Sequence, residues 1–398
     1  MLRSVVVVGA SLAGLRACEG LRHGGFDGSI TLVGAETHLP YDRPPLSKEF
    51  LAGRLGLDRL ALTSAEKLAA LELELVLGER ARAVDPSART VVLESGRQLS
   101  FDGLVVATGA RPRTMRGANA LAGVITLRDL EDAERLRALL GPGVRLVVVG
   151  GGFLGMEVAA TARGLGAEVT VVEPQAAPLL RVLGPLIGRA IGEVHADHGV
   201  DVRTRVGVAD LVGGDHVEAV RLDDGSLIGA DVVLVAVGVV PETAWLAGSG
   251  LELADGVVCA PTLLAAPGVA AAGDIARWPH ALAEGTVRLE HRTNAAEQGV
   301  HAAASLLAGA AAAAFAAVPY FWSDQFDVKI QSIGIPEGTD DVRVVAGSPA
   351  ARCFVACFGR AGLLCAVVGF NSPRQLMGFR VLLERRATLA EALAVELR

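Results

Sequence analysis

The chain has 398 residues, of which 51% are hydrophobic, so it is long enough for two or three domains with separate cores. Its formal net charge of −7 argues against nucleic-acid binding as the main activity, because phosphate contacts need clustered basic residues. The five cysteines are odd in number and form no Cys-x-x-Cys pair. We therefore expect a reducing, cytoplasmic location, without a disulfide framework or a metal site.

Residues 4–36 and 145–173 repeat one pattern. Each segment has an apolar strand, a glycine-rich turn, a helix, a second apolar strand and a final carboxylate, Glu36 or Glu173. This is the pattern of the βαβ unit that binds nucleotides, in which the N-terminus of the helix offers backbone N–H groups to phosphate. Because the unit occurs twice, the sequence predicts an α/β fold with two Rossmann-like nucleotide-binding domains.

The two turns differ in one position. The first has Gly9, Ser11 and Gly14, with serine where the pattern usually has its second glycine. The second has glycine at all three positions, Gly150, Gly152 and Gly155. The carboxylate of Glu173 favours NADH over NADPH there, because it accepts hydrogen bonds from ribose hydroxyls and repels a 2′-phosphate.

The remaining elements are predicted from apolar runs and their length. Strands ending in glycine are expected at 104–109, 232–238 and 269–274, and helices at 130–140, 157–164 and 295–307. After Pro319 we expect a small α+β domain with strands at 342–346, 353–358 and 363–370 and helices at 375–385 and 389–397. The uncharged segment 299–322 is rich in alanine and glycine, so we interpret it as a helix followed by a linker rather than a membrane span.

Several strings along the whole chain resemble the FAD-dependent, NADH-using ferredoxin reductases that supply oxygenases. Two of them are specific to that group, Pro44-Pro-Leu-Ser-Lys48 and Phe321-Trp-Ser-Asp-Gln325. The others are at 41–43, 107–113, 127–133, 150–157, 273–274 and 294–298. The resemblance implies a glutathione-reductase-like architecture. Its expected parts are an FAD domain (1–113 and 245–317), an NADH domain (114–244) and a C-terminal α+β domain (318–398).

The resemblance also implies which residues contact each cofactor. For FAD they are Gly9, Ser11, Leu12, Ala13, Gly14, Glu36, Arg43, Lys48, Ala81, Ala107, Thr108, Gly109, Arg128, Gly273, Asp274 and Arg292. For NADH they are Gly150, Gly152, Phe153, Leu154, Gly155, Glu157, Glu173, Arg181, Val237 and Gly238. Lys48 is expected beside the flavin ring, and Glu157 and Glu290 near the nicotinamide. Arg292 departs from the family pattern, which often has tryptophan at this position.

The activity that the resemblance implies is hydride transfer from NADH to FAD, followed by transfer of single electrons to an iron-sulfur ferredoxin. The ferredoxin would serve an oxygenase such as a cytochrome P450, and the reductase would be a monomer or weak dimer. Ferredoxins are acidic, so a chain of net charge −7 needs a local basic surface to bind one. The expected docking patch consists of Arg288, Arg292, Lys329 and Arg374.

Three other activities are considered. Thiol reductases of this broad fold need a cysteine beside the flavin, and the stretch 39–48 has none, which makes thiol chemistry the weakest alternative. An NADH-dependent reductase of a quinone or radical stays open. So does a redox sensor that resembles the apoptosis-inducing flavoproteins.

Overall fold

A computed structural model describes residues 2–118 and 121–395. The chain divides into two compact units, which we describe separately. Unit 1 comprises Met1–Asp42, Asp58–Arg111 and Val240–Tyr320, and unit 2 comprises Arg43–Leu57, Pro112–Val239 and Phe321–Arg398. The three-domain boundaries expected from the sequence stay a prediction.

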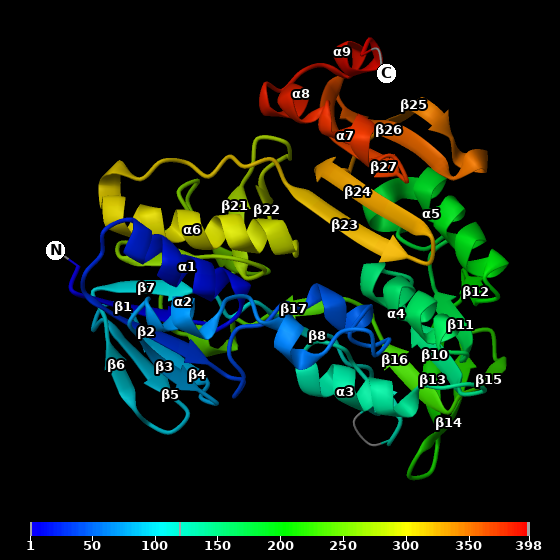
Figure 1. The fold of residues 1–398 in the computed structure, drawn as a ribbon, viewed down its shortest axis with the longest axis horizontal. Helices are drawn as coiled ribbons and strands as arrows, with labels where there is room; N and C mark the ends of the chain where they lie inside the picture. The colour runs from blue at the N-terminus through cyan, green and yellow to red at the C-terminus, as the bar shows by residue number, and fades with distance from the viewer. Residues whose placement is uncertain (1, 119–120, 396–398) are drawn as a thin grey trace. The chain divides into compact units, whose positions relative to one another are not determined.

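Unit 1 is built on a six-stranded sheet in the order β19-β20-β7-β1-β2-β3 (Figure 1). The strands are β1 (Ser4–Val8), β2 (Ser29–Gly34), β3 (Leu73–Leu77), β7 (Gly103–Val106), β19 (Leu264–Ala266) and β20 (Val269–Ala271). All neighbours are parallel except β19 and β20. Helix α1 (Leu12–His23) connects the parallel strands β1 and β2, which is the first predicted βαβ unit.

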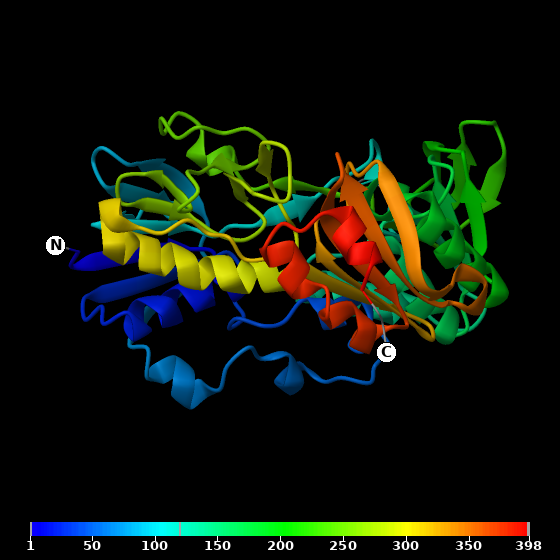
Figure 2. The same ribbon diagram turned by 90° about the horizontal axis from the view of Figure 1, so that it is seen from above.

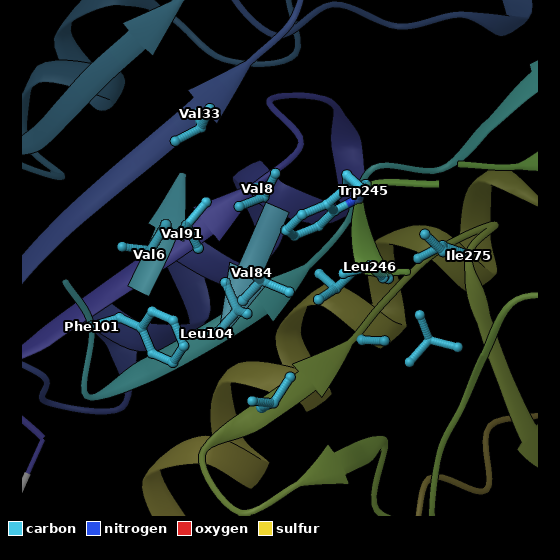
Figure 3. Close-up of a cluster of buried hydrophobic side chains, with 14 of the residues drawn as sticks. Val6, Val8, Val33, Val84, Val91, Phe101, Leu104, Trp245, Leu246 and Ile275 are labelled. Carbon is cyan, nitrogen blue, oxygen red and sulfur yellow. The ribbon is translucent and has the colours of Figure 1, made fainter. Parts of the chain in front are cut away.

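The central strand β1 buries both of its faces, because successive side chains of a strand point to opposite sides. Val5 and Val7 belong to one apolar cluster with α1 and α6 (Arg292–Ala308). Val6 and Val8 belong to a second cluster on the other side, which includes Trp245 (Figure 3). That side is covered by the antiparallel strands β4 (Ala81–Asp85), β5 (Thr90–Leu93) and β6 (Gln98–Ser100).

Helices α1 and α6 pack against each other beside this sheet (Figures 1 and 2). A Cβ atom on Gly299 of α6 would lie 2.3 Å from the carbonyl oxygen of Ala13 in α1. No side chain fits in that space, so glycine at 299 permits the close contact of the two helices. The contact brings α6 next to the first glycine-rich turn.

Unit 2 contains the second βαβ unit in a five-stranded parallel sheet of order β12-β11-β10-β16-β9. The strands are β9 (Val124–Ile125), β10 (Arg145–Val149), β11 (Glu168–Glu173), β12 (Asp201–Thr204) and β16 (Val232–Val235). The helices of this part are α3 (Leu130–Leu139), α4 (Phe153–Gly164) and α5 (Leu180–Asp197). A three-stranded antiparallel sheet is added by β13 (Val208–Gly213), β14 (Val217–Leu222) and β15 (Leu227–Gly229).

The end of the chain forms an antiparallel sheet of order β23-β24-β27-β26-β25. The strands are β23 (Tyr320–Gln325), β24 (Val328–Gly334), β25 (Asp341–Ser348), β26 (Cys353–Arg360) and β27 (Leu363–Phe370). The last helices are α7 (Pro373–Met377), α8 (Arg380–Glu384) and α9 (Leu389–Leu393) (Figure 1). The predicted fold class, α/β with a small terminal sheet domain, is confirmed.

Some predicted boundaries were wrong. The helix expected at 375–385 is divided into α7 and α8. The helix expected from residue 157 begins four residues earlier, at the turn itself. Helix α9 ends at Leu393, and residues 396–397 of the helix expected there lie outside the described part of the chain. Among the described residues, no helix is long and apolar enough to cross a membrane.

The second apolar cluster of unit 1 gives a stability prediction. Phe101 is 4% exposed within it, so Phe101→Ala should lower the free energy of unfolding by about 3–5 kcal/mol. Leu75→Ala, at a position that is 38% exposed, should cost less than about 1 kcal/mol. Urea unfolding of both variants measures the difference, and equal losses would contradict this assignment of the core.

Candidate functional site

The first glycine-rich turn needs glycine at two positions and not at the third. Gly9 has a φ of +119°, and a Cβ there would lie 2.1 Å from the carbonyl oxygen of Ala107. A Cβ on Gly14 would lie 1.9 Å from the carbonyl oxygen of Gly9. Ser11 is the N-cap of α1 with a φ of −115°, an extended conformation that any residue adopts. The departure from the usual glycine pattern therefore leaves the backbone of the turn intact.

The second turn repeats this geometry. Gly150 has a φ of +106°, and a Cβ there would lie 2.4 Å from the carbonyl oxygen of Ala236. A Cβ on Gly155 would lie 2.2 Å from the carbonyl oxygen of Gly150. Gly152 corresponds to Ser11, and a Cβ on it would have no described atom within 4 Å. That open space lies at the N-terminus of α4, where a phosphate would be placed.

Both turns fit the pyrophosphate of a dinucleotide. Helices α1 and α4 have no acidic residue in their first turns, so no carboxylate in the first turn of either helix repels an anion. The N-cap Gly152 has no side chain, which leaves the first N–H groups of α4 without a side-chain cap. Backbone N–H groups and the positive end of a helix dipole are the usual elements of an anion site.

The carboxylates after each second strand are held in place. Glu36 accepts a hydrogen bond from the hydroxyl of Tyr41 at 2.5 Å. Glu173 accepts from the backbone N–H groups of Gly151 and Gln175, each at 2.8 Å. Glu173 is therefore attached directly to the turn, at the position expected to bind a ribose.

Gly273 and Asp274 follow β20 in unit 1. Gly273 has a φ of +80°, and its N–H donates to the Oε1 atom of Gln298 at 2.8 Å. Gln298 is fully buried on α6, and no partner is found for its Nε2 atom among the described residues. The sequence prediction missed Gln298 as a site residue, although its string 294–298 was part of the family resemblance. No helix begins directly after Asp274, because α6 starts only at Arg292.

Arg288 is unsuitable for the docking patch predicted from the sequence. Its guanidinium lies 2.8 Å from Glu290 and 3.3 Å from Asp255, and its side chain is 9% exposed. It also donates to the carbonyl oxygen of Asp274 at 3.1 Å. A cation so enclosed and neutralised has little to offer a partner, so we remove it from the patch. The ion pair with Arg288 also occupies the carboxylate of Glu290, which was expected near the nicotinamide.

The other arginines predicted for the site have defined partners. Arg292 lies 2.6 Å from Asp42 in unit 1. In unit 2, Arg43 donates to the carbonyl oxygen of Arg128 at 2.6 Å, so these two candidates are adjacent. Arg181 is 76% exposed at its side chain and lies 3.8 Å from Glu337.

Several other candidates belong to segments whose backbone lies close to one of the two turns. The residue two positions before Arg181, Leu179, donates its N–H to the carbonyl oxygen of Gly151 at 2.9 Å, which brings the start of α5 to the second turn. Val237 is 40% exposed, directly after the carbonyl group that lies against Gly150. Ala107 has the same relation to Gly9, and Thr108 and Gly109 follow it.

A buried ion pair in unit 2 brings together Lys48 and Glu157. The Nζ atom of Lys48 lies 2.7 Å from Oε2 of Glu157, and both side chains are about one-tenth exposed, at 11% and 9%. Ser47 donates to the same oxygen at 2.5 Å, and Ser323 donates to Oε1 at 2.7 Å. Glu157 is therefore an acceptor for three side chains from two segments far apart in the sequence.

Two contacts fix this arrangement to α4. Thr161, one turn after Glu157, donates to the carbonyl oxygen of Ser47 at 2.8 Å. Phe153 at the start of α4 packs edge-to-face on Phe321, with ring centroids 5.1 Å apart. Ser47 and Ser323 were not predicted as site residues, although each belongs to one of the two strings specific to the family. Both strings therefore supply a hydrogen-bond donor to the carboxylate of Glu157.

The cysteines do not form a thiol relay. All five are free, and Cys18, Cys259 and Cys357 are buried. Burial raises the pKa of each of these three thiols to about 12. A thiol with so high a pKa is not a thiolate at neutral pH and is a poor nucleophile.

Comparisons with known proteins agree with this geometry. A model of the pyridine nucleotide-disulphide oxidoreductase family matches residues 3–299, and a reductase C-terminal model matches residues 320–397. The chain belongs to the pyridine nucleotide-disulphide oxidoreductase family. It is 36% identical to putidaredoxin reductase of Pseudomonas putida over 96% of this chain and 93% of that protein. It is 38% identical to the ferredoxin–NAD(+) reductase component of the biphenyl dioxygenase system of Paraburkholderia xenovorans strain LB400, over 96% and 94%.

A solved structure supports the same family. The chain matches a chain of the covalent putidaredoxin reductase–putidaredoxin complex with a TM-score of 0.94 and 34% identity, over 99% of this chain and 96% of that one. The likeness to FAD-dependent, NADH-using ferredoxin reductases is confirmed. Members of the family use FAD and NAD(H), which confirms the two predicted cofactors.

His195 on α5 is a buried titratable group that the sequence analysis did not single out. It is 0% exposed, and its Nε2 atom lies 3.0 Å from Oε1 of Gln325. No partner is found for its Nδ1 atom among the described residues. Burial lowers the pKa of the imidazole from the usual 6.5 to about 4, so the folded chain holds it neutral.

This burial predicts a pH dependence of stability. Between pH 6.5 and pH 4 the unfolded chain binds a proton at His195 and the folded chain does not, so stability is lost as the pH falls. His195→Leu should remove about 2 kcal/mol of the loss seen between pH 7 and pH 4.5. Urea unfolding at several pH values measures it. Ile191→Val, a buried change on the same helix that alters no titratable group, should keep the original slope, and an unchanged slope in His195→Leu would contradict the prediction.

Proposed function

We propose that this chain is an NADH-dependent ferredoxin reductase that binds FAD at the first glycine-rich turn and NADH at the second. The observation that carries the proposal is the pair of turns with one backbone geometry, each at the start of a helix and followed by a held carboxylate. The stretch 39–48 has no cysteine, which leaves no thiol relay beside the flavin and directs the electrons to an external acceptor. We also propose a cytoplasmic location, for which the free cysteines are the support.

The proposed roles of the residues follow from their contacts. The N–H groups at the starts of α1 and α4 bind the two pyrophosphates, and Glu36 and Glu173 accept hydrogen bonds from ribose hydroxyls. When bound, the two nucleotides supply the hydride donor and the hydride acceptor, so the protein needs no acid or base at the reacting carbon. Its own contribution is orientation and electrostatics.

We assign the electrostatic role to Lys48, with Glu157 as its partner. By the family resemblance, Lys48 is the cation that favours the reduced, anionic flavin. The Glu157 carboxylate lies 2.7 Å from the Lys48 ammonium, which positions that ammonium and partly neutralises its charge. Because the pair is shielded from solvent, its field is weakened little by water or salt.

The proposed acceptor is a small iron-sulfur ferredoxin that serves an oxygenase such as a cytochrome P450. The support is that the relatives over nearly the full chain are named as reductases of such systems. With Arg288 removed, the candidate docking residues are Arg292 in unit 1 and Lys329 and Arg374 in unit 2. Lys329 is half-exposed and lies 3.1 Å from Asp324, and Arg374 is exposed on α7.

The acceptor is tested by rapid kinetics. NADH should reduce the flavin quickly, and a two-iron ferredoxin should accelerate turnover of cytochrome c, less so as salt concentration rises. Arg374→Glu should weaken the ferredoxin-dependent rate and its salt dependence, whereas Arg343→Glu, an exposed change on β25 of the C-terminal sheet, should not. Fast flavin reduction without acceleration by any ferredoxin of a panel would favour the small-molecule reductase. Slow reduction with a long-lived reduced flavin–NAD complex would favour the redox sensor.

The choice of NADH over NADPH depends on the charge of Glu173. Glu173→Gln keeps an acceptor for the backbone and removes the repulsion of a 2′-phosphate, so the ratio of kcat/KM for NADH to that for NADPH should fall by about tenfold. Glu168→Gln, an exposed change at the other end of β11, is the control and should leave the ratio unchanged. A ratio that stays the same in both variants would place the discriminating group elsewhere.

A further inference from the structure

A chain of hydrogen bonds runs from His195 to Glu157 through the interior of unit 2. His195 lies 3.0 Å from Oε1 of Gln325, and Nε2 of Gln325 lies 3.0 Å from the hydroxyl of Ser323. Ser323 donates to Glu157 at 2.7 Å. His195, Gln325 and Ser323, which precede Glu157 along these hydrogen bonds, are each at most 2% exposed. They come from two elements, α5 for His195 and β23 for Ser323 and Gln325.

The direction of every hydrogen bond follows from Lys48. An ammonium group only donates, so Glu157 is the acceptor at one oxygen, and its other oxygen accepts from the Ser323 hydroxyl. That hydroxyl must then accept from the amide NH₂ of Gln325, which turns the amide oxygen toward His195. His195 must therefore carry its proton on Nε2, which leaves Nδ1 bare. Nδ1 is the buried ring atom for which no partner is found in the described part of the chain.

A tight hairpin places these residues. Strands β23 and β24 are joined by Phe326 and Asp327, and Phe326 has a φ of +54°. The ring of Phe326 lies against His195 of α5 and His198, the residue after α5, with centroids 5.0 Å and 4.0 Å away. Packing of the hairpin on α5 thus fixes Gln325 and, through it, Ser323.

We propose that His195, Gln325 and Ser323 are positioning residues that hold the Glu157 carboxylate, and through it Lys48, in the orientation that hydride transfer from NADH requires. This inference rests on the proposed function, in which Lys48 and Glu157 serve the transfer. In the described part of the chain, no hydrogen bond joins these three residues, which we call the relay, to Lys48 or to a glycine-rich turn. Its effect is therefore exerted on the orientation of one carboxylate, since buried polar groups in a connected network lock one another's conformations.

The test is a double-variant cycle on the holoenzyme. Gln325→Met keeps the approximate volume and removes both hydrogen bonds. It should slow single-turnover reduction of the flavin by NADH about tenfold, the loss expected when Ser323 is no longer held in its hydrogen bond to the charged Glu157, with the apparent Kd for NADH unchanged. In a Glu157→Ala background the same change should have no further effect, because the relay acts only through Glu157.

The flavin midpoint potential, measured without NADH, is the second readout. It should become more negative in Gln325→Met, because Lys48 is held less firmly, and it should not move in Asp324→Asn, the neighbouring exposed position on β23. If Gln325→Met does not fold or retain FAD, Ser323→Ala removes only the last link and should give the same two changes. Urea unfolding identifies which variants are folded.

Two outcomes would overturn the proposal. One is a rate and a potential that stay at the original values in folded Gln325→Met and Ser323→Ala. The other is an equal loss of rate with and without Glu157, which would show a general packing role. Neither readout involves ferredoxin, so failure of the proposed acceptor leaves this test intact. Conversely, if the relay variants have no effect, the proposed function is still tested separately by ferredoxin-dependent turnover.

Discussion

The structure depends on the close approach of each glycine-rich turn to the strand beside it. At Gly9 and Gly150 the backbone passes so near a neighbouring carbonyl group that a Cβ would overlap it, at 2.1 Å and 2.4 Å. The helix after each turn can then begin directly over the end of the sheet, with its N–H groups directed at the space beyond. The middle position does not require glycine, because a Cβ on Gly152 would have no described atom within 4 Å and Ser11 has an extended φ of −115°.

The nucleotide-binding units and their turns were predictable from the sequence. The two βαβ units, their turns and their terminal carboxylates were predicted because they depend on local backbone geometry and strand burial, which leave a pattern of glycine and valine. Ser47, Gln298 and Ser323 were not predicted as site residues, because a hydroxyl or amide gains its role from a partner more than 20 residues away. The family resemblance contained the signal, since each belongs to a string that was quoted for it.

Other errors have similar causes. Arg288 was placed in a docking patch because it was expected near the edge of the flavin, whereas Asp255 and Glu290 enclose it. His195 was passed over because one histidine on an amphipathic helix carries no signal of its own. Its role emerges only when the hairpin of β23 and β24 brings Gln325 against α5. Long-range pairing of this kind is the information that a single sequence does not contain in readable form.

The shielded pair of Lys48 and Glu157 and the exposed Arg374 should respond differently to dissolved salt. The pair is a compact dipole with about one-tenth exposure, so dissolved ions do not enter it. The exposed guanidinium of Arg374 is fully subject to the ion atmosphere. Under the proposed function, a change in ionic strength would therefore act more strongly on the exposed Arg374, where electrons are proposed to leave, than on the shielded pair.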